Sequence, residues 1–372
     1  MFRSSIRLFK ILGIEVRLDY SWFIIFALFS YYLGFYYLPA VVPGVNIGLL
    51  IIVTILTVIL LFFSVLFHEM SHSLIARRFG IPVNRISLFI FGGMAQIEKE
   101  ADSPGAEFLM AIAGPISSFF LAIIFGIIWA FTRDIAIIGE PARYLTIINI
   151  VLGVFNLLPG YPLDGGRVLR SVIWKATNNI QKATFVAAII GRVIGFAIIG
   201  LGIYFLFTGN FLNGVWLAFI GWFLQSSAWM GYRQLVLETS IKGIKVADVM
   251  NQDLITVPDE ITVQELVDEF FFKHRYGRFP VVNSNGCFIG VISLHDIKAF
   301  PKEKWVDIQV GDIVKSYTAD EVVGADMEVS EAIKKMTVKR SGHLVIISGQ
   351  KVVGIITKSD VLQFVKLQKE LH

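Results

Sequence analysis

The chain has 372 residues, of which 55% are hydrophobic and 17% are charged, and its mean hydropathy is +0.68. An ordinary soluble domain carries about 25% charged residues, so this composition excludes a soluble enzyme of this length, and it also excludes a disordered chain or a fibre. A single cysteine, Cys287, excludes a disulfide scaffold. The net charge is +4 and no basic block is present, so we expect no nucleic-acid partner.

The charged residues are concentrated in the C-terminal part of the chain. Residues 1–232 contain 15 Lys/Arg and 10 Asp/Glu, whereas residues 233–372 contain 18 and 19. We therefore expect a transmembrane domain over residues 1–233, a polar linker over 234–244 and a soluble module after it.

Six stretches approach the roughly 20 apolar residues that a spanning helix needs. They are residues 20–40, 46–76, 107–132, 144–168, 184–207 and 211–232. The fourth is interrupted by polar residues, Gly and Pro, and an amphipathic segment, Phe2–Asp19, precedes the first. Lys and Arg crowd one set of flanks, and the opposite loops hold only Arg133 and Arg143. The positive-inside rule then predicts a multi-pass protein of the cell membrane with both termini in the cytoplasm.

A His-Glu-Met-Ser-His motif lies in the second apolar stretch, at residues 68–72. His68 and His72 are four residues apart, so on a helix both imidazoles share one face and can bind the same zinc ion. Glu69 lies beside that face and can take a proton from a zinc-bound water, whose pKa is about 7. The alternative is a pair of histidines that hydrogen-bond to neighbouring helices, although such groups are costly at membrane depth.

Asp164 is the candidate for a third metal ligand. It lies in the stretch Asn156–Arg167, where two prolines and three glycines break the helical pattern. Irregular backbone at membrane depth is tolerated only where it is buried in protein or lines a wet cavity. The alternative is a short loop between two helices, with Asp164 as a helix cap.

Together the two motifs resemble those of the site-2 protease family of intramembrane zinc metalloproteases, over roughly residues 1–232. The resemblance implies one Zn²⁺ per chain and a membrane-protein substrate. By this resemblance the site residues are His68, His72 and Asp164 as metal ligands and Glu69 as the catalytic glutamate. The loops leave no room for the PDZ domain that bacterial members of this family often insert.

The same resemblance gives Asn156 a role in holding the substrate or stabilising its oxyanion. An amide donor near the zinc would bind developing negative charge, as in other oxyanion holes. Alternatively, Asn156 satisfies a backbone group freed near Pro159.

The segment Ile86–Glu98 is short and rich in aromatic and β-branched residues, and Gly92-Gly93 is expected to supply a hairpin turn. It resembles the re-entrant β-hairpin of the family, whose strand edge would pair with an unwound substrate. The alternative is a loop hairpin in the cytoplasm without substrate contact. In the third apolar stretch, the small residue Gly114, in Ala113-Gly114-Pro115, indicates a position where another helix packs closely.

The soluble part contains an internal repeat. Val246-Ala-Asp-Val-Met recurs 64 residues later as Val310-Gly-Asp-Ile-Val, and Gly290–Asp296 recurs as Gly354–Asp360. The residue pattern of each unit predicts a strand, a helix, two short strands and a helix. The repeat resembles a tandem pair of CBS domains, which we place at 245–303 and 304–372.

In CBS domains the matching Ser/Thr and Asp contribute to adenine-nucleotide sites. The candidates here are Ser293, Asp296, Thr357 and Asp360. A capping hydroxyl and the amides of a helix N-terminus favour a phosphate, so ATP, ADP or AMP is the expected regulatory ligand. The alternative is that these residues are ordinary helix caps in nucleotide-free repeats. CBS pairs often dimerise, so a homodimer through these domains is also expected.

These patterns predict a polytopic α-helical membrane protein with about six transmembrane helices and a re-entrant β-hairpin, joined to a cytoplasmic α+β tandem CBS module. The expected function is zinc-dependent cleavage of transmembrane substrate segments, regulated by an adenine nucleotide. The alternatives are a CBS-gated membrane transporter or channel and a catalytically inactive scaffold. A cation pathway would place carboxylates or carbonyls along successive helices, whereas the ionisable residues here cluster at one depth.

Overall fold

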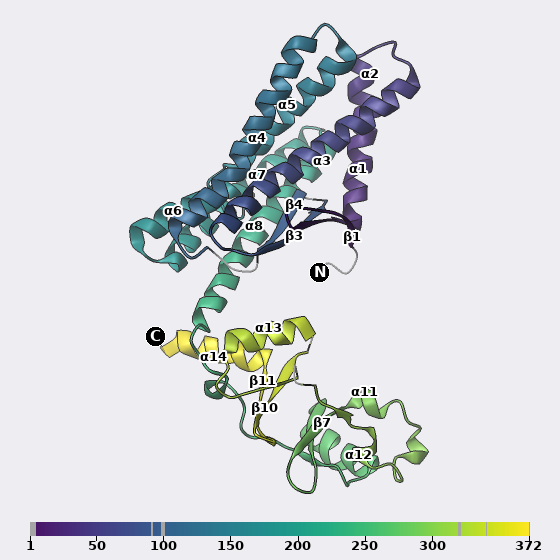
Figure 1. Ribbon diagram of the computed structural model, residues 1–372, viewed down its shortest axis with the longest axis vertical. Coiled ribbons are helices and arrows are strands. Elements are labelled where there is room, and N and C mark those ends of the chain that lie inside the picture. The colour runs from purple at the N-terminus through teal and green to yellow at the C-terminus, as the bar shows by residue number, and fades with distance from the viewer. Residues whose placement is uncertain (1–4, 91, 98–100, 319–320, 340, 372) are drawn as a thin grey trace. The chain divides into compact units, whose positions relative to one another are not determined.

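The computed structural model of the protein describes residues 5–90, 92–97, 101–318, 321–339 and 341–371. The chain divides into two compact units, Met1–Leu235 and Val236–His372 (Figure 1). Each unit is described by itself below.

The first unit is built from long helices. Within the described ranges, five helices are long and apolar enough to cross a membrane: Tyr20–Val41, Ile47–Arg78, Pro104–Thr132, Ala136–Asn156 and Ile180–Phe207. The first comprises α1 (Tyr20–Tyr32), a π-helical turn (Leu33–Tyr37) and α2 (Leu38–Val41), and the others are α3, α4, α5 and α7. A further long helix, α8 (Phe211–Ser240), is less apolar and continues through the first part of the expected 234–244 linker. The sequence therefore predicted the helical membrane fold correctly, whereas the number of spans, about six with α8 counted among them, stays a prediction.

Polar caps set where several of these helices begin. Asp19 accepts a hydrogen bond from the Ser21 amide at the start of α1, and Asn46 accepts one from Gly48 at the start of α3. Ser103 caps α4, where Pro104 takes the first helical position. Such caps satisfy backbone N–H groups that have no partner within the helix.

The fourth predicted span, residues 144–168, is wrong in its extent. Helix α5 (Ala136–Asn156) ends before the two prolines, and a separate short helix, α6 (Asp164–Thr177), begins at Asp164. Proline lacks an amide hydrogen and fixes its own φ, so two prolines three residues apart, with Gly160 between them, disfavour a single helix through this stretch.

A four-stranded sheet packs against the bundle, in the order β1-β2-β3-β4. Its strands are β1 (Ser5–Ile11), β2 (Ile14–Asp19), β3 (Val83–Phe89) and β4 (Gly92–Ile97). The segment before the first span, Phe2–Asp19, was expected to be amphipathic, and its described residues, from Ser5 on, form the β1–β2 hairpin. Ile14, on the buried face of β2, packs in one cluster with Met70 and Ala76 of α3. The sheet thus lies beside the C-terminal half of α3.

The expected hairpin at residues 86–98 is present as β3 and β4, but its turn is not where the glycines are. Gly92 pairs with Phe89 and Gly93 pairs with Leu88, so both glycines belong to strand β4. The turn therefore precedes Gly92, and residues 91 and 98 of the expected segment lie outside the described residues. Gly92 has a φ of +124°, a conformation that favours glycine.

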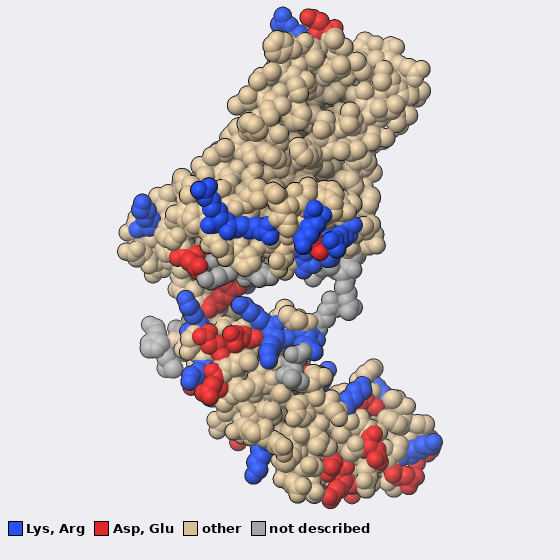
Figure 2. Space-filling model, viewed as in Figure 1, with Lys and Arg blue, Asp and Glu red and all other residues tan. Residues whose placement is uncertain are grey.

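Charges on the first unit are unevenly placed. On the face shown in Figure 2, a broad surface without Lys, Arg, Asp or Glu separates two charged ends, and Lys and Arg gather at the end that carries the sheet and α6. A wide uncharged belt is what a bilayer core requires.

The second unit contains the sequence repeat. The first repeat has β5 (Val257–Pro258), a helical stretch of α9, a π-helical turn and α10 (Val263–His274), β6 (Arg278–Val282), β7 (Phe288–Ser293) and α11 (Leu294–Ile297). The second has β9 (Val322–Val323), α13 (Val329–Lys339), β10 (His343–Ser348), β11 (Lys351–Thr357) and α14 (Lys358–Leu371). Short pieces at Val246–Asp248, Lys302–Lys304, α12 (Val310–Ile313) and β8 (Lys315–Ser316) complete the unit. This is the predicted order of strand, helix, two strands and helix in both copies.

The two repeats exchange the segments that begin them. Val246 is fully buried in the core of the second repeat with Leu344, and its amide donates to Met327 O at 2.8 Å. Conversely, Val310 is buried in the core of the first repeat, and its amide donates to Ile261 O at 2.9 Å. The boundary at residue 303 therefore separates sequence repeats, whereas each hydrophobic core draws on both.

Candidate metal centre

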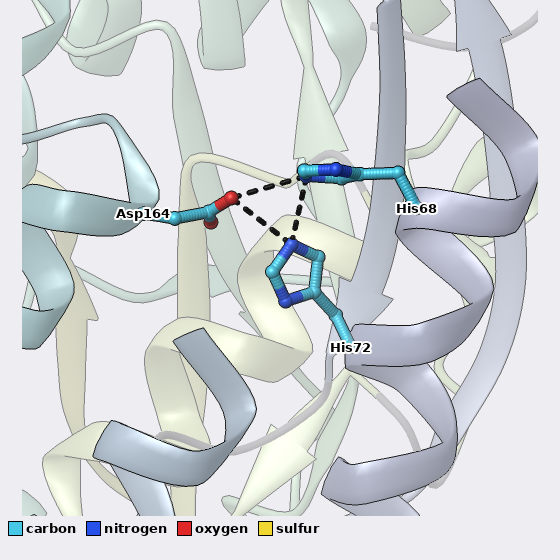
Figure 3. Close-up of side chains that lie close together, drawn as sticks. All are labelled: His68, His72 and Asp164. Carbon is cyan, nitrogen blue, oxygen red and sulfur yellow. Dashed lines mark hydrogen bonds and ion pairs between the residues drawn. The ribbon is translucent and has the colours of Figure 1, made fainter. Parts of the chain in front are cut away.

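Helix α3 carries the two histidines of the motif on one buried face. His68 and His72 are 4% and 5% exposed, and their Nε2 atoms are 3.1 Å apart. Residues four apart in a helix lie nearly one above the other, which explains this convergence. In Figure 3 both rings point away from α3 toward the same carboxylate.

That carboxylate belongs to Asp164, the first residue of α6. Its Oδ2 atom lies 3.1 Å from His68 Nε2 and 3.2 Å from His72 Nε2. The residue before it, Leu163, occupies the cap position and makes no side-chain capping bond. Asp164 is therefore turned to the histidines and is not used as a helix cap.

The three donor atoms have the dimensions of a zinc site. Tetrahedral zinc with ligands at about 2.0–2.1 Å places each pair of ligand atoms about 3.3 Å apart. The three separations here are 3.1, 3.1 and 3.2 Å. The residues present therefore fit a zinc ion with one open coordination position.

The outer nitrogens of both imidazoles are also held. His72 Nδ1 lies 2.6 Å from Met110 O, a carbonyl that can only accept, so Nδ1 carries a proton. His68 Nδ1 lies 2.8 Å from Ser118 Oγ. In the neutral tautomer that the Met110 contact selects, Nε2 of His72 points a lone pair at the Asp164 carboxylate. Converging lone pairs of this kind repel one another unless a cation lies between them. Contacts to the outer ring nitrogen, such as those of Met110 and Ser118, are typical of metal-bound histidine.

Room for the metal comes from a glycine on α4. A Cβ atom at Gly114 would overlap Nε2 of both His68 and His72. Only hydrogen fits at this position, so a larger residue would occupy the space in front of the two metal-binding nitrogens.

Glu69 and Asn156 lie outside this three-residue group. Glu69 is half-buried, and its Cγ lies so close to Gly93 of β4 that a side chain there would overlap it. Asn156 ends α5, and its Nδ2 donates to Leu152 O at 3.0 Å. The structure thus places Glu69 between α3 and the edge strand, and Asn156 beside the chain break that leads to Asp164.

Sequence reasoning did not find the residues that support the histidines. Met110 acts through its backbone carbonyl, which no side-chain pattern reveals. Gly114 was interpreted only as a position of close helix packing, and Ser118, four residues further along the same apolar helix, was missed.

The second unit contains a cavity of about 530 Å³ lined by residues of both repeats. Tyr276, Arg278, His343, Thr357 and Asp360 are among its lining residues. Asp360 Oδ2 accepts hydrogen bonds from the Thr357 amide and hydroxyl, both at 2.8 Å. Burial, assisted by the charge of Arg278, lowers the pKa of His343 below its usual value.

The equivalent pair in the first repeat is arranged differently. Of the described residues, those that line this cavity do not include Ser293 or Asp296. Asp296 accepts from Ser293 and forms a 3.0 Å ion pair with Lys315. Burial opposes ionisation of Asp296, but hydrogen bonds from Ser293 and Lys315 outweigh it and lower the pKa of the carboxyl. The two predicted nucleotide motifs are therefore not equivalent.

A buried His₂Asp donor set, supplied by the spanning-length helix α3 and the short helix α6 in an apolar helix bundle, defines a class, the membrane proteins with a zinc centre of the hydrolase type. Comparison with known proteins gives the family. Peptidase family M50 matches residues 56–138 and 132–202, and the CBS domain matches residues 246–303 and 310–367.

Relatives cover nearly the whole chain. Zinc metalloprotease MJ0392 of Methanocaldococcus jannaschii is 33% identical over 371 residues, which are 99% of this chain and 98% of that protein. The solved structure of the Site-2 Protease from the same organism is 29% identical, with a TM-score of 0.42, over 61% of this chain and 94% of that one. CBSX2 in complex with AMP is 23% identical, with a TM-score of 0.31, over 34% of this chain and 99% of that one.

The chain belongs to Peptidase family M50, the site-2 protease family, and is a zinc metalloprotease with tandem CBS domains. This confirms the predicted family and enzyme class, and it favours the metalloprotease over the CBS-gated transporter or channel.

Proposed function

We propose that this protein hydrolyses a peptide bond within a membrane-spanning substrate segment, at a zinc centre formed by His68, His72 and Asp164. The observation that carries the proposal is that the three donor atoms of these residues lie together, buried, inside an apolar helix bundle. At 1.5 Å per residue, His72 and His68 lie about 9 and 15 Å along α3 from Arg78 at its basic end. A bond cut there lies inside the bilayer, near one surface.

Zinc, when bound, supplies a Lewis acid and a water acidic enough to attack a carbonyl at neutral pH. The chain's own residues do the rest. Glu69 follows His68 directly, so its carboxylate takes the proton of the attacking water and returns it to the leaving amine. Asn156 keeps one amide hydrogen beyond its bond to Leu152 O, and this hydrogen serves the developing oxyanion.

Strand β4 supplies the binding surface for the substrate backbone. It ends the sheet order β1-β2-β3-β4, so one of its edges carries backbone groups that do not pair within the sheet. Gly93 of this strand lies against Glu69. A substrate that unwinds from a helix pairs with this edge by strand addition, which exposes its peptide bond next to the catalytic glutamate.

The CBS cavity binds an adenine nucleotide and regulates cleavage. Asp360 has one oxygen committed to Thr357 and a second available for ribose hydroxyls. Arg278 supplies positive charge for phosphate, and Tyr276 supplies an aromatic face for the base. Because Lys and Arg gather at one end of the first unit, we place this module and both termini in the cytoplasm. We also propose a homodimer that forms through the CBS domains.

The test is cleavage of single-span membrane substrates in liposomes. Wild-type protein is expected to cleave, to lose activity with a zinc chelator and to regain it with added Zn²⁺. Asp164→Asn is expected to be inactive, whereas Asp134→Asn, an exposed aspartate after α4, should cleave normally. ATP, ADP and AMP are then added separately, and a change in rate with one of them supports regulation. Cleavage by Asp164→Asn at the wild-type rate would contradict the proposed centre.

A further inference from the structure

One face of α4 carries every contact that supports the histidines, together with one further residue. Glu107, Met110, Gly114 and Ser118 follow at intervals of three, four and four residues. At 100° per residue they fall within about 80° of one another around the helix. Met110 and Ser118 hold the histidines and Gly114 leaves room for the metal, so Glu107 is the one member without a role in the centre described above.

Glu107 pairs with the helix that carries the third ligand. Its side chain is fully buried, and its Oε1 accepts from Arg170 Nε at 2.6 Å and also contacts Arg170 Nη2. Arg170 is itself only 5% exposed, and Arg167 Nε lies 3.9 Å from the same oxygen. Among the described residues, Glu107 Oε2 has no hydrogen-bond partner. The guanidinium of Arg170 also lies over the ring of Tyr161, 5.7 Å from its centre.

Stability alone does not account for this pair. A buried ion pair costs both partners their hydration, and apolar residues of similar volume often replace it without loss of stability. The unpartnered Oε2 adds to that cost. A charged, directional contact does fix geometry, because a guanidinium binds a carboxylate in few orientations.

The geometry that it fixes is that of α6. Near Asp164, the helix is held by close contacts: a Cβ at Gly165 or Gly166 would overlap the backbone of residues 157–161. Helix α6 also packs against α4 and α7, but these contacts are less directional than an ion pair, so the fixed point near Asp164 does not by itself set the rotation of the helix. Arg170 lies six residues beyond Asp164, about 9 Å along the axis, and supplies the second point.

We propose that Glu107 and Arg170 are positioning residues that orient α6 so that Asp164 completes the zinc centre. The inference rests on the proposed metal centre. Helix α4 then sets all three ligands, two of them through direct contacts to His68 and His72 and the third through the Glu107–Arg170 pair. Loss of such a supporting contact typically weakens metal binding 10–100-fold.

The test separates orientation from stability. Glu107→Gln or Arg170→Met alone removes one charge of a buried ion pair and is expected to lower the unfolding temperature as well as zinc affinity. The double variant E107M/R170M removes both charges and is expected to unfold near the wild-type temperature in the zinc-free state. Its zinc dissociation constant, measured by chelator competition in detergent, is nevertheless expected to rise 10–100-fold. The visible spectrum of its Co²⁺-loaded form should also change, because that spectrum reports ligand geometry.

The matched control is Glu140→Gln. Glu140 forms an ion pair with Arg143 at 3.6 Å near the first residues of α5, at the other end of that helix from Asn156, and its loss should leave zinc affinity and the Co²⁺ spectrum unchanged. A double variant that binds zinc as tightly as wild type, with the same Co²⁺ spectrum, would overturn the inference and leave the proposed function intact. Wild-type protein that binds no zinc would overturn both.

Discussion

The tightest constraint in the metal centre is the absence of a side chain at Gly114, and Gly114→Ala tests it. The added Cβ would lie 2.5 Å from His68 Nε2, and it would overlap His72 Nε2 more severely. An ordinary contact of this kind is about 3.4 Å, so the imidazoles must retreat by about 1 Å. Zinc–ligand distances tolerate about 0.2 Å. We therefore expect zinc affinity to fall by more than the roughly 100-fold that loss of an outer contact costs.

The assay is zinc content after purification, followed by chelator competition. Gly126→Ala is the matched control on the same helix, because its Cβ would meet the Thr146 side chain at ordinary distances of 3.6 and 3.9 Å. Alanine is favoured over glycine within a helix by about 1 kcal/mol, so both variants should fold. If Gly114→Ala held one zinc per chain with wild-type affinity, the placement of the metal in front of this glycine would be refuted.

Two further predictions concern the CBS unit. Asp360→Asn is expected to weaken binding of AMP or ATP at least tenfold in a fluorescence titration, because ribose contacts are lost. Asp296→Asn, whose partner is Lys315, should have little effect on nucleotide affinity. Equal losses of affinity in the two variants would contradict the difference between the repeats. Because the pKa of His343 is lowered in the folded state, this residue favours folding while it is neutral, and its contribution is lost as pH falls below about 6.5. Intrinsic amide exchange slows as pH falls, so the quantity to measure is the protection factor of β10, which corrects for it. This protection factor should fall between pH 7.5 and 5.5, and His343→Gln should remove that fall; an unchanged pH dependence in the variant would contradict the assignment.

The sequence was most informative where an ionisable group lies in an apolar helix, because burial of such a group costs free energy. His68, His72 and Asp164 stood out because ionisable groups are rare in apolar helices, and the structure brings these three together. Met110 could not be predicted, because it acts through a backbone carbonyl and its place depends on how α4 packs on α3.

Errors in the predicted fold have identifiable causes. The polar, Gly and Pro residues of the stretch 144–168 marked an interruption, but they did not show that α5 ends at Asn156 and that a separate helix begins at Asp164. Strand β2 was detectable, because Ile14, Val16 and Leu18 alternate with polar residues and are all buried. Its partner β1 alternates in two short runs, Ile6–Leu8 and Phe9–Ile11, but an irregularity between Arg7 and Phe9 breaks the pattern, and six of its seven residues are exposed. The exchange of Val246 and Val310 between the repeats depends on tertiary packing, which an internal repeat does not reveal.

The most direct test of the central claim is Glu69→Gln beside wild type, with zinc content and substrate cleavage measured on the same preparations. Glu69 belongs to neither the three metal donors nor their outer contacts, so both proteins are expected to hold one zinc per chain. Cleavage should fall by about 10²–10⁴-fold in the variant, because the proton acceptor is lost while the metal stays. Cleavage by Glu69→Gln at the wild-type rate, or wild-type protein that is active without zinc, would contradict the account.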